Sequence, residues 1–296
     1  MSNQNNPNSK IQAGQEPRAA AAIPYKKSAF SLVMTVLTWA AAVLSVAILV
    51  FLVGFVLIRG VGNITPDLFS LKYTTENASV IPAIVNTLEM TVIALVIAVP
   101  IGICAAIFLV EYTNNTGKVV GIIRITAETL SGIPSIVYGL FGMLFFTIAL
   151  KLGYSMISGA LTLAIMVLPL IMRTSEEALK SVPVSYREAS FGLGAGKLRT
   201  IFKIVLPAAM PGILSGIILA TGRIVGETAA LLYTAGSVAQ YAAPMDSGRT
   251  LAVHMYVLSS EGLYMDKAFA TAVILLVMVL LINAVSSFFA KKITKG

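Results

Sequence analysis

The sequence predicts an all-α, polytopic membrane protein with six transmembrane helices, and three observations support this fold class. Of the 296 residues, 57% are hydrophobic and only 11% are charged, whereas soluble domains carry charges at about a quarter of their positions. The mean hydropathy is +0.88. The apolar residues gather in segments long enough to cross a bilayer core roughly 30 Å thick as helices.

The chain opens with residues 1–27, which are rich in Asn, Gln, Pro and Ala and lack the layout of a secretory signal. We expect a disordered cytoplasmic tail there. The first span and the extracytoplasmic loop that follows it occupy 28–80, and the core of the protein occupies 81–292. Six apolar segments are predicted to span the membrane: 31–58, 83–110, 122–150, 156–172, 208–232 and 268–290.

The third span is interrupted by the sequence SGIPS at 131–135. Proline removes a backbone donor and frees a carbonyl group, which protein or a wet cavity must satisfy because lipid cannot. A helix kink is the simpler interpretation of this break, and a place where a substrate path meets the backbone is the sharper one.

The positive residues predict the orientation of the chain. Six spans place both termini on one side, and most Lys and Arg residues outside the spans lie on that side. Five lie on the other side: Arg59, Lys72, Lys151, Arg249 and Lys267. The positive-inside rule therefore predicts that both termini and the polar loop at 173–207 are cytoplasmic. Because the net charge of +8 follows this sidedness, it does not indicate nucleic-acid binding.

The loop at 173–207 carries the strongest local signals. The sequences TSEE at 174–177 and SYRE at 185–188 fit the Ser/Thr-x-x-Glu capping pattern of helix starts. Glycines at 192, 194 and 196 are expected to end a helical turn, and 197–205 can form a second short helix that stops before Pro207. We therefore expect a compact cytoplasmic knob.

This knob does not fit a nucleotide-binding motif. Lys197 stands where the third glycine of G-x-G-x-x-G would be, and Leu198 follows the Gly-Lys pair where a P-loop needs Ser or Thr. The closely spaced glycines and a set of apolar residues favour docking against another protein. These apolar residues are Leu193, Ile201, Phe202 and Val205.

Two charged pairs lie within the predicted spans. Arg223 is about 22 Å along the fifth span, and Glu227 is four residues further on, which places both on one face of a continuous helix. Intramembrane charges are functional by default, although a self-neutralising ion pair is the alternative. Arg124 and Glu128 repeat the spacing near the cytoplasmic interface, where a structural role is favoured. Glu89 stays open between a path residue and an interfacial one.

A resemblance to a known family rests on the loop and its flanks. Glu188, Ala189 and Ser190, then Gly194, then Ile204, Leu206 and Pro207 resemble, in identity and spacing, the EAA signature of ABC-importer permeases. Ser190 stands where that family usually has Ala. The segments 131–139, 172–179 and 223–229 are similar to the PstA-type permeases of phosphate importers. The resemblance covers the chain from about the second span onward.

The resemblance implies an ABC type I importer permease fold and a transport subunit that hydrolyses no ATP itself. Such a subunit moves inorganic phosphate across the cytoplasmic (inner) membrane. Its expected partners are a second homologous permease subunit, a cytoplasmic ATPase dimer, an extracytoplasmic phosphate-binding protein and membrane lipid. The residues expected to couple to the ATPase, within the loop at 174–207, are Glu188, Ala189, Gly194, Ile204, Leu206 and Pro207. The residues expected along the substrate path are Arg223, Glu227, Arg173, Ser131 and Ser135.

The chemistry of the fifth span supports phosphate. Arg223 offers a planar fork of donors to phosphate oxygens, and an ionised Glu227 can accept a hydrogen bond from a protonated phosphate oxygen. Sulfate is fully deprotonated and has no proton to give.

Other functions stay open. A permease for another oxyanion, such as molybdate or sulfate, is the alternative within the class, and an ion-coupled carrier is the alternative outside it. A membrane enzyme finds no support, because no nucleophile and base stand at a recognisable spacing. The single Cys104 and the single His254 rule out a disulfide within the chain and argue against a zinc site. We expect no metal or other cofactor.

Overall fold

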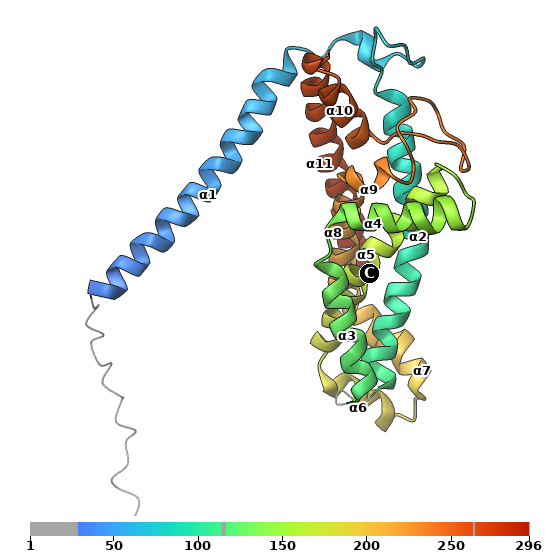
Figure 1. Ribbon diagram of the computed structural model, residues 1–296. Helices are drawn as coiled ribbons and strands as arrows, with labels where there is room; N and C mark the ends of the chain where they lie inside the picture. Colours follow the sequence, from blue (N-terminus) through green and yellow to red (C-terminus); the bar gives the residue numbers. More distant parts are fainter. Residues whose placement is uncertain (1–28, 114–116, 263, 296) are drawn as a thin grey trace, which may run out of the picture. The chain divides into compact units, whose positions relative to one another are not determined.

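The computed structural model describes residues 29–113, 117–262 and 264–295, and the predicted tail at 1–27 lies outside them. The described residues are helical and contain no strand, which confirms the all-α fold class (Figure 1). The α-helices are α1 (Ala29–Val61), α2 (Ile81–Ile107), α3 (Lys118–Ser131), α4 (Ser135–Gly142), α5 (Met156–Ser181), α6 (Val184–Gly192), α7 (Lys197–Thr200), α8 (Leu206–Val225), α9 (Ala229–Leu232), α10 (Leu251–Ser260) and α11 (Met265–Lys295).

Four shorter turns complete the set. They are the 3-10 helix η2 (Pro66–Phe69) and the π-helical turns η3 (Phe108–Tyr112), η4 (Met143–Ala149) and η5 (Ile201–Val205). The chain divides into two compact units, Met1–Val53 and Gly54–Gly296. The first unit contributes the beginning of α1, and the packing that follows is all within the second.

The number of spans agrees with the prediction. Within the described residues, five stretches are long and apolar enough to cross a membrane: α1, α2 with η3, α5, α7 through α8, and α11. The sixth is the pair Val120–Ser131 and Ser135–Ala149, which bends by 101°. The break at 131–135 is thus a corner rather than the simple kink. The hydroxyl of Tyr138 donates to the carbonyl of Leu130 at 2.7 Å, and the same carbonyl also accepts from the N–H of Ile133 at 3.1 Å, so both bonds help to hold the corner.

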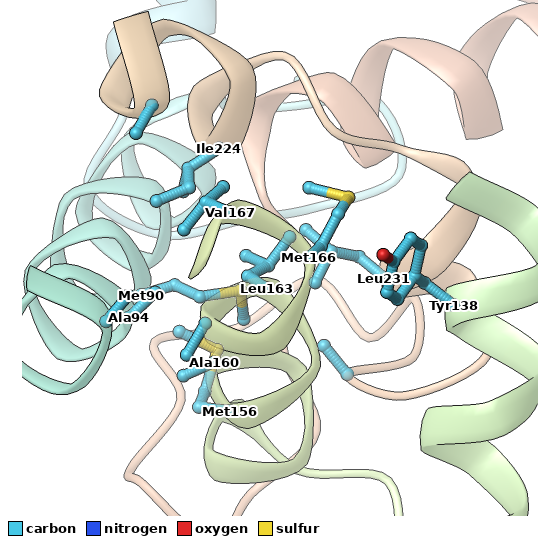
Figure 2. Close-up of a cluster of buried hydrophobic side chains, with 14 of the residues drawn as sticks. Met90, Ala94, Tyr138, Met156, Ala160, Leu163, Met166, Val167, Ile224 and Leu231 are labelled. Carbon is cyan, nitrogen blue, oxygen red and sulfur yellow. The ribbon is translucent and has the colours of Figure 1, made fainter. Parts of the chain in front are cut away.

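The core of the second unit is built around α5, which packs along α2 on one side and α8 on another. Figure 2 shows side chains from α2, α4, α8 and α9 converging on α5. Small residues allow close approach: a Cβ added to Gly139 would stand 2.7 Å from the Cα of Ala230, so α4 lies directly against α9. The corner in the third span is thereby fixed against the segment that follows α8.

Two helices extend further than expected. The predicted start at 174–177 is wrong, because α5 runs without interruption to Ser181. There the hydroxyl of Thr174 donates back to the carbonyl of Leu170 at 2.9 Å instead of capping a new helix. The predicted stop before Pro207 is also wrong: η5 continues directly into α8, and its wider π turn carries the helix past the proline.

The start of α6 also differs from the capping prediction. The helix begins at Val184 after Pro183, and no side chain caps it. The predicted extracytoplasmic connections contain η2 and the unpredicted helix α10.

Candidate functional site

The structure places the two charges predicted for the fifth span differently from the expectation, because α8 ends between them. Arg223 lies in the last turn, α8 ends at Val225, and Gly226 follows as the cap. Glu227 therefore stands beyond the helix, and the prediction that it shares a helix face with Arg223 is wrong. No ion pair joins the two side chains in the part of the chain that the structure describes.

Glu227 instead supports the next short helix. It is buried, and its Oε1 accepts a hydrogen bond from the backbone N–H of Ala230 in the first turn of α9 at 3.1 Å. A carboxylate at this position satisfies a donor that the start of a helix leaves free. Since one oxygen is engaged in this way, the other carboxylate oxygen is left for chemistry.

Two helix breaks meet near these charges. The break at 131–135 leads into α4, which lies against α9, and Ile133 packs on the same hydrophobic cluster as Ile224 of α8. Non-helical backbone at membrane depth is tolerated where it is buried in protein or lines a wet cavity. The arrangement brings a half-buried cation, a buried carboxylate and two backbone breaks together.

The two serines of the break differ in their surroundings. Ser131 is exposed, and its hydroxyl donates to the carbonyl of Glu128 at 2.9 Å. Ser135 begins α4 and is half-buried. Both serines lie at the ends of the break that forms the corner.

A second group of charges surrounds a pocket of about 200 Å³ between α3 and α5. Its lining residues are Arg124, Ala127, Glu128, Met172, Arg173, Glu176, Glu177 and Lys180. Glu176 is 7% exposed and pairs with both Arg124, at 2.7 Å, and Lys180, at 2.6 Å. The charges of α3 thus reach α5, and the burial of Glu176 explains why α5 does not stop at Met172.

Arg173 is the least constrained cation of this pocket. Its guanidinium lies 3.7 Å from Glu128 and 3.6 Å from Glu177, and its side chain is 54% exposed. These separations are longer than hydrogen bonds. The side chain can therefore turn toward another anion at little cost.

The loop between α5 and α8 forms the predicted helix, glycine turn and helix. Gly194 has a φ of +79°, and the space around it is open. Leu193 is 89% exposed and Phe202 is exposed as well, whereas Ile201 and Val205 are buried in the core, so only two of the four predicted docking residues face outward. Ser190 is buried and its hydroxyl shares a 2.8 Å hydrogen bond with that of Thr200, which ties the two helices together.

A groove of about 310 Å³ opens on this loop, and its residues come from the signature and its neighbours. They are Ser190, Leu193, Gly194, Ala195, Arg199, Lys203 and Ile204. Glu188, Ala189 and Pro207 are exposed nearby, and Leu206 is half-buried. The surface combines cations with apolar side chains, which suits a protein partner.

Sequence reasoning missed the residue that anchors this loop. Arg187 directs Nε and Nη2 to Oε1 of Glu111 at 3.0 and 2.7 Å, and it donates to the carbonyls of Val182 and Leu179. Glu111 is in η3, at the end of the second span. The available signal was a lone acid at the end of an apolar segment, but nothing local indicated its partner 76 positions away.

The described residues contain no group of three or more His, Cys, Asp or Glu side chains that could hold a metal ion. The chemistry that the side chains offer is recognition of an anion by arginine and of a hydroxyl donor by carboxylate.

Comparisons with known proteins agree with this arrangement. Residues 98–296 match the family described as binding-protein-dependent transport system inner membrane component. The probable ABC transporter permease protein YqgI of Bacillus subtilis is 34% identical over 278 residues, which cover 86% of this chain and 92% of that protein. The phosphate transport system permease protein PstA 1 of Mycobacterium tuberculosis is 44% identical over 154 residues, and this match spans about half of each chain (52% and 50%).

Solved structures show the same fold. A bacterial alginate ABC transporter, in complex with an alginate-bound periplasmic protein, contains a chain that superposes with a TM-score of 0.63 at 16% identity. The superposition covers 90% of this chain and 94% of that one. At this identity the likeness concerns the fold.

Proposed function

The chain belongs to the family of binding-protein-dependent transport system inner membrane components, and from this premise we propose that it is the permease subunit that carries inorganic phosphate in an ATP-driven importer. The coarser part of this statement, a multi-pass permease subunit of an ABC importer, is given by the family and its relatives. Phosphate as the substrate is supported by the PstA relatives and by the chemistry around Arg223.

One observation carries the proposed path: two helix breaks and a cation meet beside a buried carboxylate. In transporters, discontinuous helices commonly form the substrate site because their backbone ends and nearby side chains can face the substrate. Arg223 would bind two phosphate oxygens through its planar fork. Glu227 would accept a hydrogen bond from a protonated phosphate oxygen through the carboxylate oxygen that Ala230 does not engage.

Replacement of the carboxylate tests this chemistry. Uptake of labelled phosphate is measured with and without excess sulfate in the wild-type importer, in Glu227→Gln and in Glu261→Gln, an exposed acid at the end of α10 that serves as control. Loss of an acceptor that reads a substrate hydroxyl should lower the preference for phosphate over sulfate by about tenfold or more. Unchanged selectivity in Glu227→Gln would refute the assignment.

We also place Arg173, Ser131 and Ser135 along the proposed phosphate path. Arg173 would receive the anion on the cytoplasmic side, since its ion pairs are long and its side chain is exposed. The two serines would supply hydroxyl groups at the corner. Arg173→Gln should reduce the uptake rate while leaving the phosphate preference unchanged, because Arg173 would meet the anion after selection.

The loop between α5 and α8 would couple the chain to a separate ATPase. The support is its exposed groove, which contains Gly194 and Ile204 and is flanked by Glu188 and Ala189. A tagged Gly194→Trp chain should lose the co-purifying ATPase and the associated ATP hydrolysis. Gly153→Trp is a matched control, because Gly153 also has a positive φ (+64°) and open surroundings but lies between η4 and α5.

Equal retention of a fully active ATPase by both variants would contradict the coupling role.

The family membership also leads us to propose a second homologous permease subunit, a cytoplasmic ATPase dimer and an extracytoplasmic phosphate-binding protein as partners. We also propose that the chain lies in the cytoplasmic membrane with both termini inside, on the basis of the positive residues.

A further inference from the structure

An arginine in the connection between α9 and α10 has no partner for the most selective part of its side chain. Arg249 is 4% exposed, and its Nε and Nη2 atoms are buried without a hydrogen-bond partner among the described residues. These two N–H groups point the same way and form the side-on fork of a guanidinium. Such a fork matches two oxygens of a carboxylate or phosphate.

The backbone around Arg249 is held firmly. Asn86, at the start of α2, donates to the carbonyls of Gln240 and Arg249 at 2.8 and 3.2 Å, and it accepts from the N–H of Ala242 at 3.2 Å. A Cβ on the preceding Gly248 would come within 2.9 Å of the Asn86 amide. The fork is thus presented by a preorganised loop.

Two neighbours define the surroundings of the fork. The ring of Tyr73 covers one face of the guanidinium, with 4.9 Å between Cζ and the ring centroid, and a ring on the face leaves the in-plane edge free. The same ring meets the imidazole of His254 edge-on at 6.2 Å. Arg249 and His254 therefore both contact one aromatic side chain.

His254 offers the opposite hydrogen-bonding character. It is fully buried, and its Nε2 lies 3.1 Å from the carbonyl of Ala78. A carbonyl only accepts, so Nε2 carries the proton and Nδ1 is left as an acceptor. Nδ1 is buried and has no partner among the described residues. Donors for unprotonated oxygens and an acceptor for a hydroxyl thus occur together.

We propose that Arg249 and His254 form a second oxyanion site, distinct from Arg223 and Glu227, that takes hydrogen phosphate from the extracytoplasmic side. The fork of Arg249 binds two unprotonated oxygens, and Nδ1 of His254 accepts a hydrogen bond from the hydroxyl group of the anion. The identity of the anion rests on the proposed function. A phosphodiester lipid headgroup shares the charged oxygens but has no hydroxyl on phosphorus, so the chemistry favours the free anion.

Access to this site requires part of the segment at 70–79 to move, because Tyr73 belongs to it. This segment makes most of its hydrogen bonds within itself, for example between Thr74 and Asn77. It is tied to the rest of the unit by a few contacts. Besides His254, these include the Tyr241 hydroxyl on the carbonyl of Leu71 and the Lys267 ammonium on the carbonyl of Glu76. Ala78 and Ser79 are buried, and Ala78 packs against Leu258 and Ala268, so the opening is confined to residues 70–77 and leaves the contact between Ala78 and His254 in place.

The test counts bound phosphate on the complete importer, purified in dodecyl maltoside, which contains no phosphate. In equilibrium dialysis with labelled inorganic phosphate, Arg249→Gln and Arg223→Gln should each bind one phosphate fewer than the wild type, because any sites on the partner subunits are the same in all three samples. Arg249→Lys keeps the charge without the fork and should weaken the second site about tenfold. Arg59→Gln is the matched control, since Arg59 also stacks on an aromatic ring but is exposed, and it should keep both sites.

The two proposals fail differently. If Arg223→Gln alone lowers the count relative to the wild type, the second site is refuted and the phosphate path stands. If Arg249→Gln alone lowers the count, the second site stands and the proposed path fails. Thermal melting with and without phosphate gives a second readout, because bound ligand raises the melting temperature and Arg249→Gln should lose part of that shift.

Two other occupants are outcomes that would overturn the proposal. Phosphatidylglycerol that is retained by the wild type and lost in Arg249→Gln, with an unchanged phosphate count, would assign the fork to a lipid headgroup. An unchanged phosphate count together with lost capture of the binding protein would assign it to a carboxylate of that partner.

Discussion

Arg187 and Arg249 present the same side-on fork from the two ends of the second unit, since α6 and α10 lie at opposite ends in Figure 1. At Arg187 both fork atoms meet one oxygen of Glu111 within the same chain. At Arg249 both fork atoms are buried and have no hydrogen-bond partner among the described residues. A guanidinium stays charged at any physiological pH, so only the first of these charges is neutralised by the fold itself.

The difference separates a structural task from a binding task. The cations around the end of α5 share carboxylates of their own chain, with Glu176 serving both Arg124 and Lys180. The buried carboxylate at that end is therefore neutralised within the chain. At the other end, a cation–π contact with Tyr73 offsets only about 2 kcal/mol of the cost of a buried charge, and that cost is several kcal/mol.

The largest effect on stability should come from removing the carboxylate that neutralises the fork of Arg187. Glu111→Gln leaves Arg187 buried with two carbonyl partners and no counter-charge, and we expect a loss of about 3 kcal/mol in the free energy of unfolding. Denaturant titration of the purified protein measures it. The double variant Glu111→Met with Arg187→Met should recover most of the loss, because an apolar pair removes both charges. A double variant as unstable as the single one would show that the fork is not the cause.

The next largest effect should come from acid, which we expect to reduce the stability of the end of the unit that contains Arg249 and His254. Burial, followed by repulsion from Arg249, lowers the pKa of His254 to about 3, although the hydrogen bond to Ala78 acts in the opposite direction. Above about pH 6.5 the imidazole is neutral in both the folded and unfolded chain. As the pH falls from 6.5 toward 3, only the unfolded chain takes up the proton, so stability falls by about 2 kcal/mol between pH 6.5 and 5.

The matched variant for this effect is His254→Gln, whose amide can still donate to Ala78. Melting temperatures between pH 5 and 7 should fall less steeply in the variant than in the wild type. Parallel curves would mean that His254 takes up its proton in the folded protein, with an ordinary pKa.

The ring of Tyr73 over the guanidinium of Arg249 should contribute less to stability. Tyr73→Leu removes the ring over Arg249 and should cost about 1–2 kcal/mol. In an Arg249→Gln background the same change should cost less, and a double-mutant cycle measures the difference. Phe55→Leu, beside the exposed Arg59, is the control and should show a smaller coupling. Equal coupling at both rings would remove the distinction between a buried and an exposed cation.

The smallest effect should come from replacing Lys180, one of the two cations that share the carboxylate of Glu176. Lys180→Gln should cost less than about 1 kcal/mol, because Lys180 is 43% exposed and Glu176 keeps its bond to Arg124. Glu176→Gln should cost clearly more, since it removes the buried partner of both cations. The same denaturant titration compares them, and equal losses would show that Lys180 is not dispensable.

The spans and the loop signature could be predicted because their signals are local. Hydropathy marks each span, and the positive φ of Gly194 follows from its place after a helix. The extension of α5 could not be predicted in this way. The Ser/Thr-x-x-Glu pattern is local, whereas the burial of Glu176 depends on Arg124, which is 52 positions away.

The candidate sites show the same limit. Helical spacing placed Arg223 and Glu227 together, but Gly226 between them ends the helix. Arg249 appeared only as one cation of a polar connection. Its surroundings depend on Asn86, which is 163 positions away, and on Tyr73, and no pattern within a window of the sequence connects these residues.

One further consequence comes from the continuity of the helix that passes Pro207. From Lys197 to Val225 the backbone is a single helical element of 29 residues, which is about 43 Å long at 1.5 Å per residue. A bar of this kind transmits a push or a twist from one end to the other with little loss. Its joints are the glycines beyond its two ends, Gly194 and Gly226. The π turn η5 and Pro211 lie within this element, so bending at either place would reduce the part of a stroke at the loop that reaches Glu227.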